Sequence, residues 1–475
     1  MTAPVLAIIV IALCGMPLFC CLAALGLFGL HHGQSPLSAG VADIYRLAGP
    51  EAVSLSTIPL FTFIAYLMAA AKSGQRLIRV ANAVMGWIPG GLALMTVWTC
   101  AFFTTFTGAS GVTIVALGGL ILPELERAKY GQRFSLGVVT GSGSVGLLFP
   151  PALPLIVYGI IFALNAGHAG GVEAPIDFSI ERFLFAGIVP GCVLVGLLSV
   201  YCVVRGWVQK VPRTGFAWWK PLALLLPPVG FVWGMVVDRE FRAACIALIP
   251  EALIPAVVLV PMITGLATIP EAAALAALYV FILEVMVYRD IDFRRDLLNV
   301  TRESMTLVGA IFVKIVGATV LTAYFVDAGV PQALFEWLGQ YVHSAAGFLL
   351  VLNVVLLLVG CMMDIFSAIV VVVPLIVPAA AMFHIDPYHL GVIFLLNLEI
   401  GYLLPPAGLN LFIAAFRFNR PITDLYRAVI PFILIMFVAL MLVTYIPALT
   451  VVPPAPKNPA AQSVAPAPSD TPLPP

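Results

Sequence analysis

Two heptapeptides decide the fold: Gly-Leu-Leu-Phe-Pro-Pro-Ala at 146–152 and Gly-Tyr-Leu-Leu-Pro-Pro-Ala at 401–407. Both fit the pattern G-x-L-x-P-P-A, and both interrupt long apolar segments. Proline has no N–H and clashes with the preceding turn, so two in succession unwind a helix locally. Backbone carbonyls freed in this way cannot face lipid. They must therefore line a protein-enclosed cavity or bind an ion.

The composition excludes most other classes of protein. Of the 475 residues, 62% are apolar and only 10% are charged, whereas an average soluble domain has about 25% charged residues. The net charge is zero, and no basic patch of the kind that binds nucleic acid is present. The apolar runs are long and continuous, unlike the short alternating segments of an outer-membrane barrel. We therefore expect an all-α polytopic membrane protein, embedded in a lipid bilayer and without a nucleic-acid partner.

The potentially reactive residues give no support for an enzyme. The eight cysteines lie in apolar stretches without a CxxC pair, so we interpret them as packing residues. The six histidines show no HxxxH or HExxH spacing. We find neither a nucleophile–base pair nor a set of metal ligands at membrane depth. We expect no catalytic residue and no cofactor.

Long apolar segments run through most of the chain, and a membrane span needs about 20 apolar residues. The first is too long for the core of a signal peptide and lacks a basic start, so we expect it to be a retained span. Residues 451–475 are rich in Pro, Ala and Ser, and we predict a disordered tail. The candidate segments are 5–30, 55–71, 88–122, 134–164, 183–204, 221–287, 304–326, 345–382, 390–416 and 428–446.

Most of the 23 lysines and arginines fall into five clusters, which lie within 72–79, 127–133, 205–220, 289–302 and 417–427. Only two of these basic residues, Arg46 and Arg182, lie in the three connections 31–54, 165–182 and 327–344. By the positive-inside rule, the clusters are cytoplasmic and the three poor connections are external.

This topology predicts two hairpins. The segment 88–122 has a cytoplasmic cluster at each end, whereas 345–382 is flanked by external connections. Each segment must enter and leave on one side, and the two must point in opposite directions. Their midpoints fall near Thr105 and Asp364, where the sequence turns polar. Between the clusters at 205–220 and 289–302 the number of crossings must be even, yet three apolar pieces are present; one of them is expected at the interface or as a partial span.

The order of span, hairpin and proline-broken span therefore occurs twice, with opposite orientation. Ser110 precedes Pro150, and Asp364 precedes Pro405, by the same number of residues to within one. This repeat is typical of inverted-topology transporters, in which unwound carbonyls and polar side chains bind sodium while freed helix N-termini suit a carboxylate.

Several polar residues at membrane depth are candidates for function. The hydroxyl-rich first tip and Gly141-Ser142-Gly143-Ser144 are interpreted as ion or substrate contacts, or as small residues at a tight helix crossing. A mid-membrane carboxylate costs about 2.5–3.5 kcal/mol, so Asp364 is expected to bind a cation or to form a structural pair. Asn397 is a possible ligand.

Three further charged residues allow more than one interpretation. Glu399 is either a proton site or a helix–helix bond. Lys314 interrupts an apolar helix, and it snorkels, pairs with a carboxylate or attracts substrate. Glu271 most simply caps a helix N-terminus.

The motifs resemble those of a known family. FTGASG at 106–111, LGGLILPELERAKYGQRFSLGVV at 117–139 and GSVGLLFPPALPLIVYG at 143–159 are similar to the first-half signature of the large membrane subunit of tripartite ATP-independent periplasmic (TRAP) transporters. Residues 360–412, from GCMMDIFSAIV to NLEIGYLLPPAGLNLF, resemble its second-half signature. The likeness covers roughly residues 45–447.

The resemblance implies a sodium-coupled, elevator-type importer of organic acids in the bacterial inner membrane. Such a large permease subunit works with a small four-helix membrane subunit and a periplasmic substrate-binding protein. In this family, hairpin tips and proline breaks bind the sodium ions, which serve as coupling ions. Carried over to this chain, the resemblance implies cation ligands at Thr107, Gly108, Ser110, Pro150, Gly360, Asp364, Ser367, Asn397, Gly401 and Pro405. The substrate contacts are expected at Thr105, Ser110, Ser142, Ser144 and Asn410.

An elevator divides the chain into a fixed scaffold and a mobile core. Residues 1–87 are expected to be scaffold spans, 88–164 the first half of the transport core, and 165–299 scaffold spans with connecting or interfacial helices. Residues 300–344 supply a scaffold span and an external loop, 345–416 the second half of the core, 417–450 a C-terminal span, and 451–475 the tail.

Three other functions remain as alternatives. A related inverted-hairpin transporter of carboxylates or ions would take substrate without a binding protein. A membrane-embedded enzyme would need the reactive groups that the sequence lacks, and a non-transporting assembly subunit would leave the mirrored broken helices unexplained.

Overall fold

The computed structural model describes residues 16–33, 37–47, 49–166, 178–211, 219–225, 227–330, 333, 340–406 and 408–452. This part of the chain is helical throughout. Seven of its helices are long and apolar enough to cross a membrane, or up to nine if each of two bent pairs counts as one span. The prediction of an all-α polytopic membrane protein is confirmed. Residues 5–15 of the expected first span, and 453–475 of the tail, lie outside the described residues.

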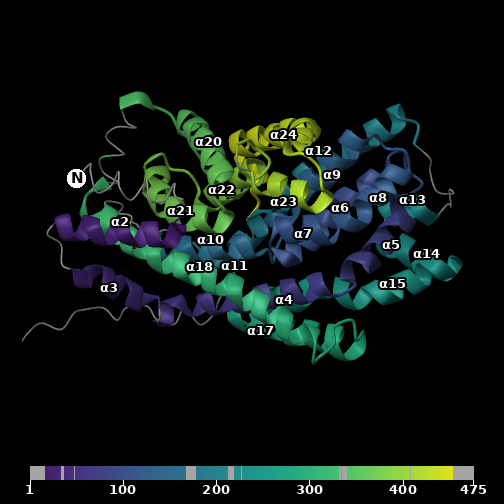
Figure 1. The fold of residues 1–475 in the computed structure, drawn as a ribbon, viewed down its shortest axis with the longest axis horizontal. Coiled ribbons are helices and arrows are strands. Elements are labelled where there is room, and N and C mark those ends of the chain that lie inside the picture. The colour runs from purple at the N-terminus through teal and green to yellow at the C-terminus, as the bar shows by residue number, and fades with distance from the viewer. Residues whose placement is uncertain are drawn as a thin grey trace, which may run out of the picture.

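One body of the protein is built around the long helix α18 (Asp296–Asp327). It packs against α2 (Leu18–His32), α3 (Leu37–Arg46) and α4 (Thr57–Ala70), and α4 also contacts α17 (Ile269–Phe281). Figure 1 shows α2 and α18 side by side, although they are far apart in sequence. Glycine makes this approach possible, because a Cβ on Gly26 would lie 2.7 Å from the backbone of Val320 and Leu321.

The region 221–288 contains two elements long enough to cross a membrane. The first is the bent pair α15 (Arg239–Ala252) and α16 (Ile254–Ile263), and the second is α17, continued by the π-helix η3 (Ile282–Val287). The third apolar piece forms two short helices, α13 (Trp219–Leu225) and α14 (Pro227–Val237), which pack on each other. The even number of crossings in this region stays a prediction. The predicted cap at Glu271 is confirmed, since its carboxylate accepts the N–H and the hydroxyl of Thr268, both at 2.8 Å.

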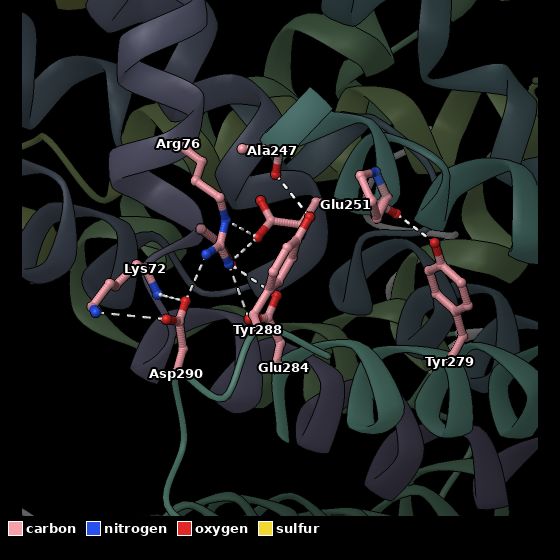
Figure 2. Close-up of polar contacts among 10 residues, drawn as sticks. Lys72, Arg76, Ala247, Glu251, Tyr279, Glu284, Tyr288 and Asp290 are labelled. Atoms are coloured by element: carbon pink, nitrogen blue, oxygen red, sulfur yellow. Dashed lines mark hydrogen bonds and ion pairs between the residues drawn. The ribbon is translucent and has the colours of Figure 1, made fainter. Parts of the chain in front are cut away.

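A charged network attaches the amphipathic helix α5 (Ser73–Met85) to this first body (Figure 2). The guanidinium of Arg76 bonds three carboxylates: Glu251 (Nε–Oε1 2.6 Å), Glu284 (Nη2–Oε2 3.0 Å) and Asp290 (Nη1–Oδ2 2.6 Å). It also lies 4.0 Å from the centre of the Tyr288 ring, and the Tyr288 hydroxyl donates to the carbonyl of Ala247. These partners come from α15, η3 and the turn after it, so one side chain joins three segments to α5.

The second body contains both predicted hairpins and both proline-broken helices. In the first half, α6 (Gly91–Thr107) turns back into α7 (Ser110–Ala116) and α8 (Gly118–Arg127). These are followed by α9 (Gln132–Ser142), the 3₁₀ turn η2 (Val145–Leu148) and α10 (Leu153–Ala166). In the second half, α20 (Ala345–Met362) and α21 (Ile365–Met382) precede α22 (Pro387–Gly401) and α23 (Leu409–Phe418). In both halves the helix is interrupted at the predicted proline pair, and in the first half the two parts are bent by 42°.

Helix α22 lies at the centre of this second body. Every residue from Tyr388 to Gly401 is buried, as expected for a helix that is apolar on all sides and enclosed by others. Its neighbours are α20, α21, α10, η2, the short helix α11 (Ile180–Ala186) and α24 (Ile422–Tyr445). The second broken helix is therefore held by elements from both halves of the chain.

Helix α12 (Ile188–Val208) covers most of the span 183–204, which we expected on the scaffold. It packs against α6, α24 and η2. The contact with α6 involves backbone, since a Cβ on Gly90 would lie 2.3 Å from the carbonyl oxygen of Cys202. Its assignment to the scaffold stays a prediction.

The Arg76 network predicts a large loss of stability in Arg76→Met. Removing the guanidinium leaves three buried carboxylates without their common cation, which should cost about 3–5 kcal/mol. The measurement is the midpoint of thermal unfolding of the purified protein in detergent. Lys72→Met is the matched control, because the Lys72 side chain is 67% exposed and its Nζ lies as far as 3.7 Å from Oδ1 of Asp290. Equal midpoints for the two variants would contradict the role given to Arg76.

Candidate functional site

The first hairpin tip turns at a glycine whose backbone conformation favours no other residue. Helix α6 ends at Gly108, which has φ +58° and donates its N–H to the carbonyl of Thr104 at 2.7 Å. A Cβ at Gly108 would lie 2.6 Å from Cβ of Leu153, the first residue of α10. The tip is therefore pressed against the helix that follows the first proline pair.

Hydroxyl groups join this tip to the first proline-broken element. Thr104 donates to the carbonyl of Gly143 at 2.9 Å, and Thr105 donates to the carbonyl of Gly146 at 3.3 Å. The hydroxyls of Thr104 and Thr107 also contact that of Thr113, at 2.8 and 3.3 Å. Thr104 and Thr105 thus join the tip to Gly143 and Gly146, and Thr107 reaches Thr104 through Thr113.

Two buried serines lie in this broken element with unused oxygens. Ser142 and Ser144 are fully buried, and neither hydroxyl has a hydrogen-bond partner among the residues described. The buried hydroxyl of Thr140, four residues before Ser144, also has no hydrogen-bond partner among the described residues. Buried polar groups are nearly always paired, so each of these oxygens has room for a hydrogen bond or an ion contact that the described residues do not supply.

The second hairpin tip is joined to the second broken helix in a related way. The N–H of Ile365 donates to the hydroxyl of Tyr402 at 2.5 Å. Gly360 faces Gly401 so closely that a Cβ on Gly401 would lie 2.6 Å from Cα of Gly360. The Pro405–Pro406 peptide is cis, as is Pro150–Pro151 in the first half. Gly360 and Gly401 were predicted together, whereas Tyr402 occupies a variable position of the heptapeptide and was missed.

Asp364 caps the helix that follows the second tip and also carries an ion pair. Its carboxylate accepts the N–H of Ser367 at 3.2 Å and the hydroxyl of the same residue. Lys314, from α18, places Nζ 2.8 Å from Oδ1 of Asp364. Of the interpretations open for Lys314, pairing with a carboxylate is confirmed. Its partner could not be named from sequence, because 50 residues separate the two.

Asn397 and Glu399 lie inside the second body. The Asn397 amide donates to Asn353 Oδ1, on α20, at 2.7 Å and to the carbonyl of Ile393 at 2.8 Å. Its Oδ1 has no partner among the described residues. Glu399 is fully buried beside the peptide group of Leu147, and its oxygens accept no hydrogen bond of ordinary geometry from the described part of the chain.

One hydrogen bond links the two halves at the tips. The hydroxyl of Ser110 donates to Oδ1 of Asn410 at 2.7 Å, across 300 residues of sequence, and both side chains are buried. The amide nitrogen of Asn410 has no partner among the described residues. The tip of the first hairpin therefore touches the segment after the second proline pair.

Both tips reach one cavity of about 1330 Å³. One wall comes from α4 and α18, and the other comes from residues 108–112, 364–366 and α23. Its charged lining residues, among those described, are Lys314, Asp364, Glu303 and Arg417. Of the residues expected to contact substrate, Ser110 lines the cavity. The other four are not among its lining residues: Thr105, Ser142, Ser144 and Asn410. Glu303 and Arg417 were not predicted for the site.

Comparison with known proteins identifies the family. The model of the DctM component of tripartite ATP-independent periplasmic transporters matches residues 5–449. The chain belongs to this family. It is therefore a transporter component rather than an enzyme, and a multi-pass protein of the bacterial inner membrane.

Curated relatives match nearly the whole DctM-family chain. It is 32% identical over 416 residues to the C4-dicarboxylate TRAP transporter large permease protein DctM of Pseudomonas aeruginosa, covering 88% of this chain and 90% of that one. It is 31% identical to the isethionate TRAP transporter permease protein DctMQ of Oleidesulfovibrio alaskensis, covering 84% of this chain and 58% of that one.

A solved structure has a similar fold. The YdaH transporter of Alcanivorax borkumensis superposes with a TM-score of 0.60 at 16% identity, covering 95% of this chain and all of that one. At this identity the likeness concerns the fold alone.

The contact between Gly360 and Gly401 predicts that Gly401→Ala destabilises the core. The added Cβ would overlap the backbone of the hairpin, and overpacking of this kind costs about 1–3 kcal/mol. The measurement is again thermal unfolding of the purified protein. Gly309→Ala on α18 is the matched control, because a Cβ there meets nothing within 4 Å and alanine favours a helix. A Gly401→Ala variant as stable as Gly309→Ala would contradict the close contact.

Proposed function

We propose that this DctM-family chain imports an organic acid by sodium-coupled secondary transport, with the two-hairpin body moving against the body built on α18. The observation that carries the proposal is the meeting of both hairpin tips at one cavity, joined by the bond between Ser110 and Asn410. A site assembled from two similar halves of a chain is the usual arrangement in secondary transporters.

The arrangement in space supports the opposite orientation of the two hairpins. In Figure 1, α6, α7 and α8 lie on the right of the molecule, whereas α20 and α21 lie on the left. The labels of α5, α8 and α13, elements that contain or adjoin clusters of Lys and Arg, also lie on the right. With the clusters in the cytoplasm, the first hairpin enters from the cytoplasmic side and the second from the outside.

The chemistry of the tips suits sodium, which prefers several hard oxygen ligands. In the first half, the hydroxyls of Ser142 and Ser144 lie just before the start of the 3₁₀ turn η2 and have no partner among the described residues. We infer that Thr107, Gly108, Ser110 and the backbone up to Pro150 hold one ion. Gly360, Asp364, Ser367, Gly401 and Pro405 would hold a second. Asn397 would contribute through Oδ1, since its amide nitrogen is used by Asn353.

The cavity suits an inward-facing state. It extends from the tips to Ala70 and Arg417, near the cytoplasmic clusters. The substrate's carboxylate would meet Ser110 and the helix ends between the hairpins, where freed N–H groups favour an anion. Transport would then carry the hairpin body across the membrane while α2, α4 and α18 stay in place.

The partners follow from the family. Its description is of a tripartite periplasmic transporter, which favours dependence on a periplasmic binding protein over a permease acting alone. We infer that the second partner is the small four-helix membrane subunit. The relative named DctMQ supports this, because the present chain matches only 58% of its length. The name of the C4-dicarboxylate relative supports an organic acid as substrate.

Replacing sodium by potassium should abolish uptake. The measurement is accumulation of a radiolabelled organic acid, with succinate as the first probe and others in parallel, in proteoliposomes that contain this chain, its small subunit and the binding protein. An inward sodium gradient should drive uptake of the acid that the binding protein captures. Equal uptake of that acid from potassium would contradict sodium coupling.

Asp364→Asn should raise the sodium concentration for half-maximal uptake about tenfold. The variant removes a charged oxygen ligand worth about 1.4 kcal/mol or more. Asp386→Asn is a matched control, because Asp386 also caps a helix, accepting the N–H groups of Tyr388 and His389, and asparagine caps equally well. Ordinary sodium dependence in Asp364→Asn would remove this residue from the site.

A further inference from the structure

The proposed function assigns no role to Lys314, although this residue lines the cavity. It interrupts an apolar stretch of α18, with Val313 and Ile315 as neighbours, and its side chain is 22% exposed to the cavity. A charge at this depth is costly and persists where it has a function or a partner. Its partner is the carboxylate of Asp364, at 2.8 Å.

The ammonium occupies a position that a metal cation would also need. Oδ1 of Asp364 accepts both Lys314 Nζ and the Ser367 hydroxyl, while Oδ2 accepts the Ser367 N–H. An arriving cation would therefore meet a carboxylate already neutralised by a lysine. Since two cations at one carboxylate oxygen repel each other, the cation binds well only if Lys314 moves away.

The pair also joins the two bodies of the protein. Lys314 belongs to α18, which packs on α2 and α4, whereas Asp364 belongs to the second hairpin. Any displacement of the hairpin body along α18 must break this contact. The pair therefore holds the two bodies together as long as no other cation takes the carboxylate.

A displaced Lys314 would remain in the cavity as an unpaired cation. The other charged lining groups described lie elsewhere: Glu303 is three turns away on α18, about 16 Å along its axis, and the Arg417 guanidinium donates to the carbonyl of Val115 at 3.0 Å. An anionic group entering the cavity would restore neutrality beside Lys314. Cation and anion would then each favour the binding of the other.

We propose that Lys314 is a tethered competitor for the cation site at Asp364: a monovalent cation displaces the ammonium into the cavity, where it becomes the receptor for an anionic group. The cation part of this assignment rests on the proposed sodium coupling. The chain thus links cation binding to release of the contact between its two bodies.

The experiment measures binding of radioactive sodium to the purified complex without substrate, with choline as the replacement cation. Lys314→Met removes the ammonium and keeps the length of the side chain, so the sodium concentration for half-saturation should fall about tenfold. Lys314→Arg keeps a competing charge and should stay near the wild-type value. Lys210→Met, which removes an exposed lysine outside the cavity, should leave sodium binding unchanged.

The outcomes separate this proposal from the function on which it rests. Saturable sodium binding with the same midpoint in wild type and Lys314→Met would overturn the competition and leave sodium coupling intact. Absence of sodium binding in both proteins, each shown to be folded by its elution profile, would overturn both.

A second measurement uses the wild-type chain and does not depend on any variant folding. Lys314 is acetylated with a small amine-reactive reagent, and its modification is quantified by peptide mass spectrometry in sodium or choline. Displacement predicts that sodium raises the modification of Lys314 several-fold relative to Lys210. Equal modification in the two salts would show that the ammonium stays on Asp364, and would overturn the proposal.

Discussion

The constraint on which the rest of this structure depends is the need to satisfy backbone polar groups away from water. Each proline pair removes two N–H groups that an unbroken helix would use. In the first half, the tip hydroxyls of Thr104 and Thr105 reach the carbonyls of Gly143 and Gly146. In the second half, the Tyr402 hydroxyl accepts the N–H of Ile365 at the hairpin tip. A broken helix and a hairpin therefore form one unit, because each supplies the polar partners that the other lacks.

The two halves share this plan but differ in chemistry. The first tip is neutral, rich in hydroxyls and turned by Gly108, whereas the second carries the carboxylate of Asp364 and a partner lysine from outside the hairpin. The first half leaves the hydroxyls of Ser142 and Ser144 unused within the described part of the chain. If both places bind cations, as we propose, the first must rely on dipoles and the second on a formal charge. The second is then the more sensitive to a competing cation.

Two charged networks of this DctM-family chain join segments that are far apart in sequence. Arg76 and its three carboxylates attach α5 to α15 and η3 (Figure 2). Helix α5 is followed in sequence by α6, the first arm of the hairpin. At the other contact, Lys314 and Asp364 face the cavity. The first network is almost completely enclosed, whereas the second is partly open to the cavity and can exchange its partners. Because of this difference in exposure, Arg76 serves as a fixed anchor, whereas Lys314 is able to move away from Asp364.

The sequence by itself determined the helical membrane class, the two hairpins and the two broken helices. Apolar length, the placement of Lys and Arg and proline pairs are properties of a local stretch, and the physics of the bilayer acts on them directly. The tertiary structure decided which hydroxyl meets which carbonyl, that Ser110 bonds Asn410, and that Lys314 pairs with Asp364. It also decided that α12 packs against α6 and α24. These contacts join residues far apart in the chain, and an apolar helix surface does not specify its neighbour, so only packing could select among them.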